Sequence, residues 1–138
     1  MEFKTDQHRE QYERVTGWLT ELFGEAVQPN ADEPVLRVAW GPETVFVHFI
    51  TNDEGGVLLN LRTWPCDRLK VPDAALRLML EINAGSPIGD LLIEGLGEAE
   101  YSYTALTENL TKETLDYLFR AFAFYANEAR AQLRQFTT

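Results

Sequence analysis

The sequence is poor in the residues from which disulfide frameworks and metal centres are built. It contains one cysteine, Cys66, and two histidines, His8 and His48, none of them close to another along the chain. A lone thiol cannot form an internal disulfide, so we interpret Cys66 as a loop residue of a protein from a reducing compartment. Because the cysteine and the two histidines are far apart in the sequence, we expect neither a metal site nor a bound cofactor.

Basic residues and long apolar runs are scarce as well. Twelve lysines and arginines stand against twenty-two aspartates and glutamates, which gives a net charge of −10. An acidic surface repels a phosphate backbone, so direct binding to nucleic acid is not expected. The polar N-terminus lacks the apolar run of a secretion signal, and no segment approaches membrane-spanning length. We therefore expect an acidic, soluble, cytoplasmic protein.

No group of side chains has the spacing of a catalytic centre. Cys66 has a neighbouring carboxylate but neither an adjacent histidine nor a helix start that would activate its thiol. Residues 85–89 lack the lysine of a phosphate-binding loop, and residues 52–55 are too few for a calcium loop. The sequence therefore predicts a protein that is not an enzyme.

The sequence has enough apolar residues, 45% of the total, to form the core of one folded domain over residues 1–138. Helical spacing, with capping residues and glycine stops, predicts helices over residues 6–23, 72–84 and 111–136. Strand-like runs occupy residues 35–40, 43–50, 56–64, 90–94 and 98–106, and residues 28–34 are expected to form a loop. The order α-β-β-β-α-β-β-α predicts an α+β fold, a single antiparallel five-stranded sheet with helices on one face.

Alternation along the strands divides this sheet into an inner face, which carries residues such as Leu36 and Leu59, and an outer face. The outer face mixes aromatic and aliphatic residues with arginines, as protein-binding surfaces do. A loop or a second copy of the chain that covers this face is the alternative. The candidate partner-binding residues are Arg37, Phe46, His48, Ile50, Leu58, Arg62, Trp64 and Leu92.

Surplus apolar surface on two helices predicts self-association. The helix over residues 72–84 is apolar on most sides, and the helix over residues 111–136 carries aromatic residues off its main apolar stripe. One copy cannot easily cover both surfaces, so we expect a homodimer. The candidate interface residues are Leu78, Met79, Ile82, Tyr117 and Phe124.

Three glutamates, Glu94, Glu98 and Glu100, gather around a glycine hinge at residues 95–97. Nothing in the surrounding sequence favours an acid–base pair among them. We interpret them as an exposed acidic patch, which is either simply solvated or a docking surface for a partner with a basic surface.

The layout of the chain also carries a family resemblance. The order of elements, together with the segments Leu80-Glu-Ile-Asn-Ala-Gly85, Gly89-Asp-Leu-Leu-Ile-Glu94, Tyr101-Ser-Tyr-Thr-Ala105 and Leu110-Thr-Lys-Glu-Thr-Leu115, resembles the YbjN-like family. That family shares its fold with the type III secretion chaperones. The resemblance implies a small, acidic, often dimeric protein that binds other polypeptides, and it adds no catalytic residues.

Two functions from different classes follow. The first is a non-catalytic chaperone or adaptor that holds a segment of another protein on the outer face or on the helix over residues 6–23. The second is a small ligand-binding or enzymatic domain with a pocket beneath the C-terminal helix. A deep, closed pocket with convergent polar groups would favour the second, whereas the absence of clustered catalytic residue types favours the first.

Overall fold

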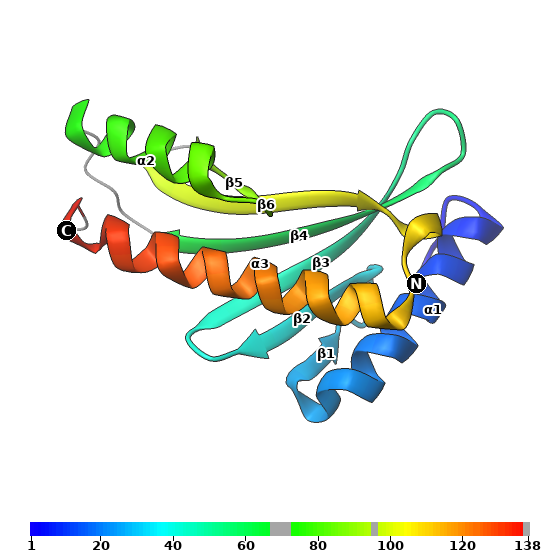
Figure 1. The fold of residues 1–138 in the computed structure, drawn as a ribbon. Helices are drawn as coiled ribbons and strands as arrows, with labels where there is room; N and C mark the ends of the chain where they lie inside the picture. Colours follow the sequence, from blue (N-terminus) through cyan, green and yellow to red (C-terminus); the bar gives the residue numbers. More distant parts are fainter. Residues whose placement is uncertain (67–72, 95–96, 137–138) are drawn as a thin grey trace.

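A computed structural model describes residues 1–66, 73–94 and 97–136 of the chain. Three α-helices lie against one face of an antiparallel sheet whose other face carries no described helix (Figure 1). The helix α3 runs along the sheet, with α1 beside its beginning and α2 near its end. The predicted α+β class, with an antiparallel sheet and helices on one face, is confirmed.

Within the described residues the sheet has six strands in the order β1-β2-β3-β4-β6-β5, and all neighbouring pairs are antiparallel. The strands are β1 (Val27–Pro29), β2 (Val35–Trp40), β3 (Glu43–Thr51), β4 (Val57–Cys66), β5 (Asp90–Glu94) and β6 (Glu98–Leu106). The prediction of five strands was wrong, because residues 27–29 pair with β2 and form an edge strand. Two of these residues, Gln28 and Pro29, belong to the stretch that was predicted to be a loop. A strand this short, ending in a proline that cannot donate a backbone hydrogen bond, has too little alternation to be recognised from its sequence.

The first and last helices begin where their capping residues predict, but the last α-helix ends at Leu133, and a 3₁₀ turn covers Arg134–Phe136. The helix α1 (Asp6–Phe23) follows Thr5, whose hydroxyl accepts a hydrogen bond from the His8 backbone N–H at 3.0 Å, and it ends at Gly24, where φ is 59°. The helix α3 (Lys112–Leu133) begins with a capping box between Thr111 and Thr114. The helix α2 (Asp73–Gly85) is described from Asp73 onward, and its predicted start at Pro72 lies outside the described residues.

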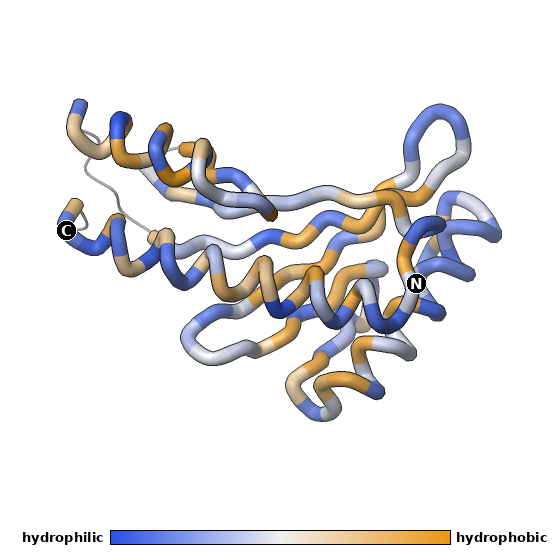
Figure 2. Tube along the Cα trace, viewed as in Figure 1, coloured by the Kyte–Doolittle hydropathy of each residue, from blue (hydrophilic) through white to orange (hydrophobic). Residues whose placement is uncertain are grey.

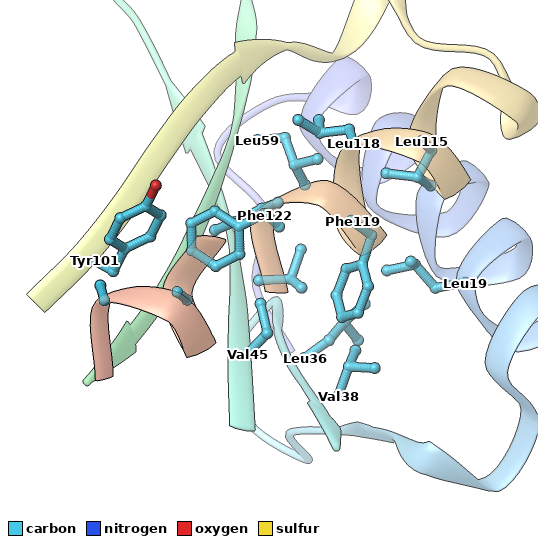
Figure 3. Packing of buried hydrophobic residues seen from close by; sticks show 14 of the residues in the cluster. Leu19, Leu36, Val38, Val45, Leu59, Tyr101, Leu115, Leu118, Phe119 and Phe122 are labelled. Carbon is cyan, nitrogen blue, oxygen red and sulfur yellow. The ribbon is translucent and has the colours of Figure 1, made fainter. Parts of the chain in front are cut away.

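The core fills the space between the helices and the inner face of the sheet. Phe119 and Phe122 of α3 are fully buried there, beside Leu19 of α1 and the inward residues of β2, β3 and β4 (Figure 3). The ring of Tyr101 on β6 lies 5.3 Å from that of Phe122, measured between centroids. Burial of each large apolar side chain contributes about 1.5 to 3 kcal/mol, so α3 is the main element that holds the sheet in place.

The structure corrects the predicted position of Cys66. It was expected in a loop, but it is buried at the end of β4 and aligned with Ala99 of β6. The register between the two strands shifts between Thr63 and Cys66, so an irregularity extends the strand beyond the predicted end at residue 64. A bulge interrupts the alternation on which the prediction depended.

Candidate protein-binding surface

The strand register brings the predicted outer-face residues together. Directly paired residues on neighbouring strands project to the same side of a sheet. The pairs are Arg37 with Phe46, Phe46 with Arg62, His48 with Asn60, and Ile50 with Leu58. The three helices pack on the opposite side, where the inner-face residues are buried (Figure 1). The paired residues therefore share the outer face of the sheet, while their role in binding stays a prediction.

An aromatic row forms the centre of this outer face. The rings of Phe46 and Trp64 meet edge to face, with centroids 5.3 Å apart and an interplanar angle of 74°. The guanidinium carbon of Arg37 lies 5.7 Å from the centroid of the Phe46 ring, within cation–π range. Tryptophan and arginine dominate the energetics of protein interfaces, so this row has the composition of a binding hot spot.

A polar cluster borders the aromatic row. Arg62 donates from Nε to Oδ1 of Asn60 at 2.6 Å and lies 3.3 Å from Oε1 of Glu100. Asn60 in turn donates to the hydroxyls of Ser102 and Thr104. These contacts hold the guanidinium of Arg62 in one orientation, so it can meet a partner without first losing conformational freedom.

The same cluster corrects the predicted acidic patch. Glu100 is 3% exposed and pairs with Arg62, so it is not part of an exposed patch. Glu98 is exposed at the start of β6, and the side chain of Glu94 lies outside the described residues. A buried carboxylate requires a partner of opposite charge, and here the neighbouring strand supplies it.

His48 sits beside this cluster on β3. Burial lowers the pKa of His48 below its usual value of 6.5, the charge of Arg62 lowers this pKa further, and Glu33 opposes the shift. A lowered pKa keeps the imidazole neutral at physiological pH, so His48 adds to the apolar character of the outer face.

Ile50, Leu92 and Leu106 are exposed apolar residues of the outer face. Leu106 was not among the predicted residues, although it pairs with Leu58 across β4 and β6. The alternation of β6, which places residues 98, 100, 102 and 104 on this face, reaches Leu106 at its next step and could have identified it.

A hollow of about 300 Å³ opens at the β1 end of the outer face. It is lined by Gln28, Pro29, Asn30, Ala31, Val35, Arg37 and Phe46. The sequence interpretation missed its rim because it treated residues 28–34 as a simple loop.

The candidate self-association residues separate into two groups. Met79 and Ile82 are buried within their own chain, and Leu78 is half-buried. Tyr117 and Phe124 of α3 are 71% and 58% exposed. The most exposed large apolar residue of α2 is Leu80 at 69%. Figure 2 shows that apolar and polar segments alternate along this helix.

A cleft of about 260 Å³ separates α2 from α3. It is lined by Glu81, Ile82, Gly85, Ser86, Phe124, Tyr125, Glu128, Ala129 and Gln132. Several of these side chains are exposed, so the cleft is open at the surface. It is not the deep, closed pocket that would favour a ligand-binding or enzymatic function.

His8 has a structural environment. Its Nε2 donates to the Phe49 carbonyl at 2.9 Å, and its Nδ1 accepts from the Lys4 backbone N–H at 3.2 Å. Within residues 1–66, 73–94 and 97–136, no group of three or more histidine, cysteine, aspartate or glutamate side chains is placed to hold a metal ion. No helix in these same ranges is long and apolar enough to cross a membrane.

Comparison with protein families matches residues 11–135 to YbjN, described as "Putative bacterial sensory transduction regulator". The chain belongs to the YbjN family. The match includes every described strand of the sheet, α1 from residue 11 onward and all of α3, so the outer face lies entirely within the YbjN region. The resemblance found in the sequence pattern is thereby confirmed. No curated protein of similar sequence was found.

Solved structures with the same fold include YbjN itself and chains from chaperone complexes. A chain in the HopA1–SchA chaperone–effector complex has a TM-score of 0.67 and 12% identity, covering 92% of this chain and 98% of that one. YbjN from E. coli, described as "a putative transcription regulator", has a TM-score of 0.59 and 17% identity, covering 88% and 92%. A chain in the complex of the Yersinia pestis type III secretion chaperone SycH with a stable fragment of YscM2 has a TM-score of 0.59 and 14% identity, covering 88% and 98%. At these identities the likeness shows a shared fold.

Proposed function

We propose that this YbjN family chain is a non-catalytic chaperone or adaptor that holds a partly unfolded segment of another protein on its outer face. The observation that carries the proposal is that the outer face, on which no described helix packs, carries the aromatic and apolar residues Phe46, Trp64, Ile50, Leu58 and Leu106. Two solved structures of the same fold are complexes in which a chaperone is bound to another protein, which supports this function.

The chemistry of the face suits an extended segment. Exposed apolar residues lie at separate points of the sheet, at Ile50, Leu92 and Leu106, so a segment that lies across several strands reaches more of them than a compact ligand does. The aromatic row supplies anchors, and the oriented Arg62 supplies a donor for carbonyls or carboxylates of the segment. A module that holds a segment of a regulatory partner also fits the description of the YbjN family as sensory transduction regulators.

The first test truncates the central anchor. Trp64→Ala should weaken binding of a partner segment by about 2 kcal/mol, roughly thirtyfold in Kd, because a hot-spot tryptophan loses its whole contact area. Partners captured from the native lysate and identified by mass spectrometry supply the segments, and titration calorimetry with synthetic peptides measures Kd. The unfolding free energy should fall by less than the roughly 3 to 5 kcal/mol of a fully buried tryptophan, because Trp64 is half-buried.

Trp18→Ala is the matched control, since Trp18 is a half-buried tryptophan on α1 that stacks with Arg14. It should leave the affinity unchanged. If Trp64→Ala left the affinity unchanged and Trp18→Ala lowered it, the binding surface would lie on α1 and the outer-face proposal would be wrong.

We further propose that the chain acts as a homodimer through the exposed apolar residues of α2 and α3, among them Leu80, Tyr117 and Phe124. Leu80→Glu should give a folded monomer, because a carboxylate buried without a partner at an interface is costly and a two-fold axis introduces it twice. Light scattering measures the mass, and circular dichroism checks the fold. Thr20→Glu, on the exposed side of α1, should remain dimeric. A monomeric mass for the unchanged protein at high concentration would refute the dimer.

A further inference from the structure

Arg37 is a cation with no acidic partner among the described residues of an acidic protein. Among the described residues, Arg62 pairs with Glu100 and Arg130 pairs with Glu43, but no carboxylate lies within ion-pair distance of Arg37. Its side chain instead lies exposed over the ring of Phe46. Acidic residues outnumber basic ones by twenty-two to twelve, so an arginine that none of the described carboxylates reaches is available to a charge from outside the chain.

The guanidinium of Arg37 borders the hollow at the β1 end of the outer face, which it lines together with Phe46 and Val35. A volume of about 300 Å³ lies at the lower limit for small-molecule pockets, so the hollow suits one side chain of a bound segment better than a free ligand. The walls are mixed: the ring of Phe46 and the branched side chain of Val35 belong to the central part of the sheet, while the end of β1 and the two residues after it, Asn30 and Ala31, form the rim.

The rim of this hollow is already ordered by its own hydrogen bonds. Oδ1 of Asn30 accepts from the backbone N–H groups of Asp32 at 2.8 Å and Glu33 at 2.9 Å. The backbone N–H of Asn30 donates to the Val35 carbonyl at 2.9 Å, which ties the turn to the start of β2. Because these hydrogen bonds already order the rim, a side chain that enters the hollow does not have to order the rim as it binds.

We infer that this hollow is a subsite for a glutamate or aspartate side chain of the segment held on the outer face, with Arg37 as its recognition residue. The inference rests on the proposed function. A guanidinium presents two parallel N–H donors that match a carboxylate, and such charge-assisted pairs are about twice as strong as neutral hydrogen bonds. The net charge of −10 disfavours a strongly acidic partner, so the segment carries one acidic side chain among apolar ones.

The nearby charges sharpen this expectation. Glu33 adjoins the hollow, because its backbone N–H donates to Oδ1 of the lining residue Asn30 at 2.9 Å, so its negative charge opposes an incoming carboxylate. Removing its charge should therefore strengthen binding of an acidic side chain, whereas removing the charge of Arg37 should weaken it. Opposite signs from two neighbouring charge changes distinguish a carboxylate subsite from a general loss of structure.

The experiment selects binders from a library of random short peptides displayed on phage, once on the unchanged protein and once on Arg37→Gln. Peptides selected on the unchanged protein should share apolar residues and an acidic residue at a fixed spacing from them, since side chains of an extended segment alternate. Selection on Arg37→Gln should keep the apolar residues and lose the acidic one.

A selected peptide and its Glu→Gln version are then titrated against the variants. Arg37→Gln should weaken the acidic peptide about tenfold or more, the usual effect of a lost charged hydrogen bond, and leave the Gln peptide unchanged. Glu33→Gln should tighten the acidic peptide only. Arg77→Gln, the same charge change at an exposed site on α2, should alter neither.

Each outcome decides between the two proposals. Peptides that depend on Trp64 but show no acidic preference, or an equal loss for both peptides with Arg37→Gln, overturn the carboxylate subsite alone. A library without binders, or binders that ignore Trp64→Ala, overturns the proposed function and the subsite with it.

Discussion

Arg130→Ala is expected to lower the free energy of unfolding by about 3 to 5 kcal/mol. The guanidinium of Arg130 on α3 holds the carboxylate of Glu43 on β3 with two hydrogen bonds, Nε to Oε1 at 2.7 Å and a terminal nitrogen to Oε2 at 3.0 Å. The Glu43 side chain is 0% exposed. Removal of the arginine leaves a negative charge in the core with the Thr63 hydroxyl, at 3.0 Å, to share it.

Urea unfolding followed by circular dichroism measures this loss. Arg9→Ala is the matched control: Arg9 pairs with Asp6 at 3.2 Å, but the two side chains are 52% and 90% exposed, so the change should cost less than about 1 kcal/mol. A double variant, Glu43→Leu with Arg130→Met, should recover most of the stability, because it removes both charges together. Equal, small effects of Arg130→Ala and Arg9→Ala would show that the buried pair does not stabilise the fold.

The pair also connects the core with the outer face. A terminal nitrogen of Arg130 lies 3.5 Å from the backbone carbonyl of Trp64, at the end of β4. The helix on one side of the sheet thus contacts the strand segment that presents the central anchor on the other. Loss of Arg130 should therefore also weaken segment binding, through displacement of Trp64.

Gly89→Ala should destabilise the protein by roughly 2 to 5 kcal/mol, the sum of backbone strain and overpacking. Gly89 has φ of 95°, a conformation that favours glycine, and a Cβ built there would lie 2.3 Å from a ring carbon of Tyr101. That ring cannot move aside, because it is fully buried against Phe122 and its hydroxyl donates to the Ile88 carbonyl at 2.7 Å. The turn before β5 would have to shift instead.

Thermal and urea unfolding of Gly89→Ala test this expectation. Gly17→Ala is the control, since Gly17 lies within α1 and an added Cβ would have no heavy atom within 4 Å. It should stabilise the protein by about 0.5 to 1 kcal/mol, because alanine is the better helix former. The same substitution at two glycines is thus expected to have opposite signs, and a neutral Gly89→Ala would contradict the close approach of Tyr101.

Local signals in the sequence predicted most of the elements. Thr5 and Gly24 mark the ends of α1, and Thr111 begins α3, because a helix end requires capping groups within a few residues. The alternation of β6 predicted which side chains join the outer face, since the period of a strand is two. The family resemblance depended on the same local patterns and their order.

Errors arose where the local signal was short or interrupted. The strand β1 has three residues and exists through its pairing with β2, and the register shift before Cys66 breaks the alternation of β4. Glu100 was interpreted as exposed because it gathers with Glu94 and Glu98 around the glycine hinge at residues 95–97. Its partner, Arg62, lies on a strand that no local pattern could align with it.

The sequence by itself determined the acidic composition, the three helices, the five longer strands and most of the outer face, because these depend on residues near one another along the chain. Only the tertiary structure decided which charges are paired and where the surface is hollow. Glu43 and Arg130 are 87 residues apart, and the hollow beside Arg37 is lined by residues 28–31, at the end of β1, together with residues of β2 and β3. Contacts between distant segments follow from packing, which no periodicity within one segment can express.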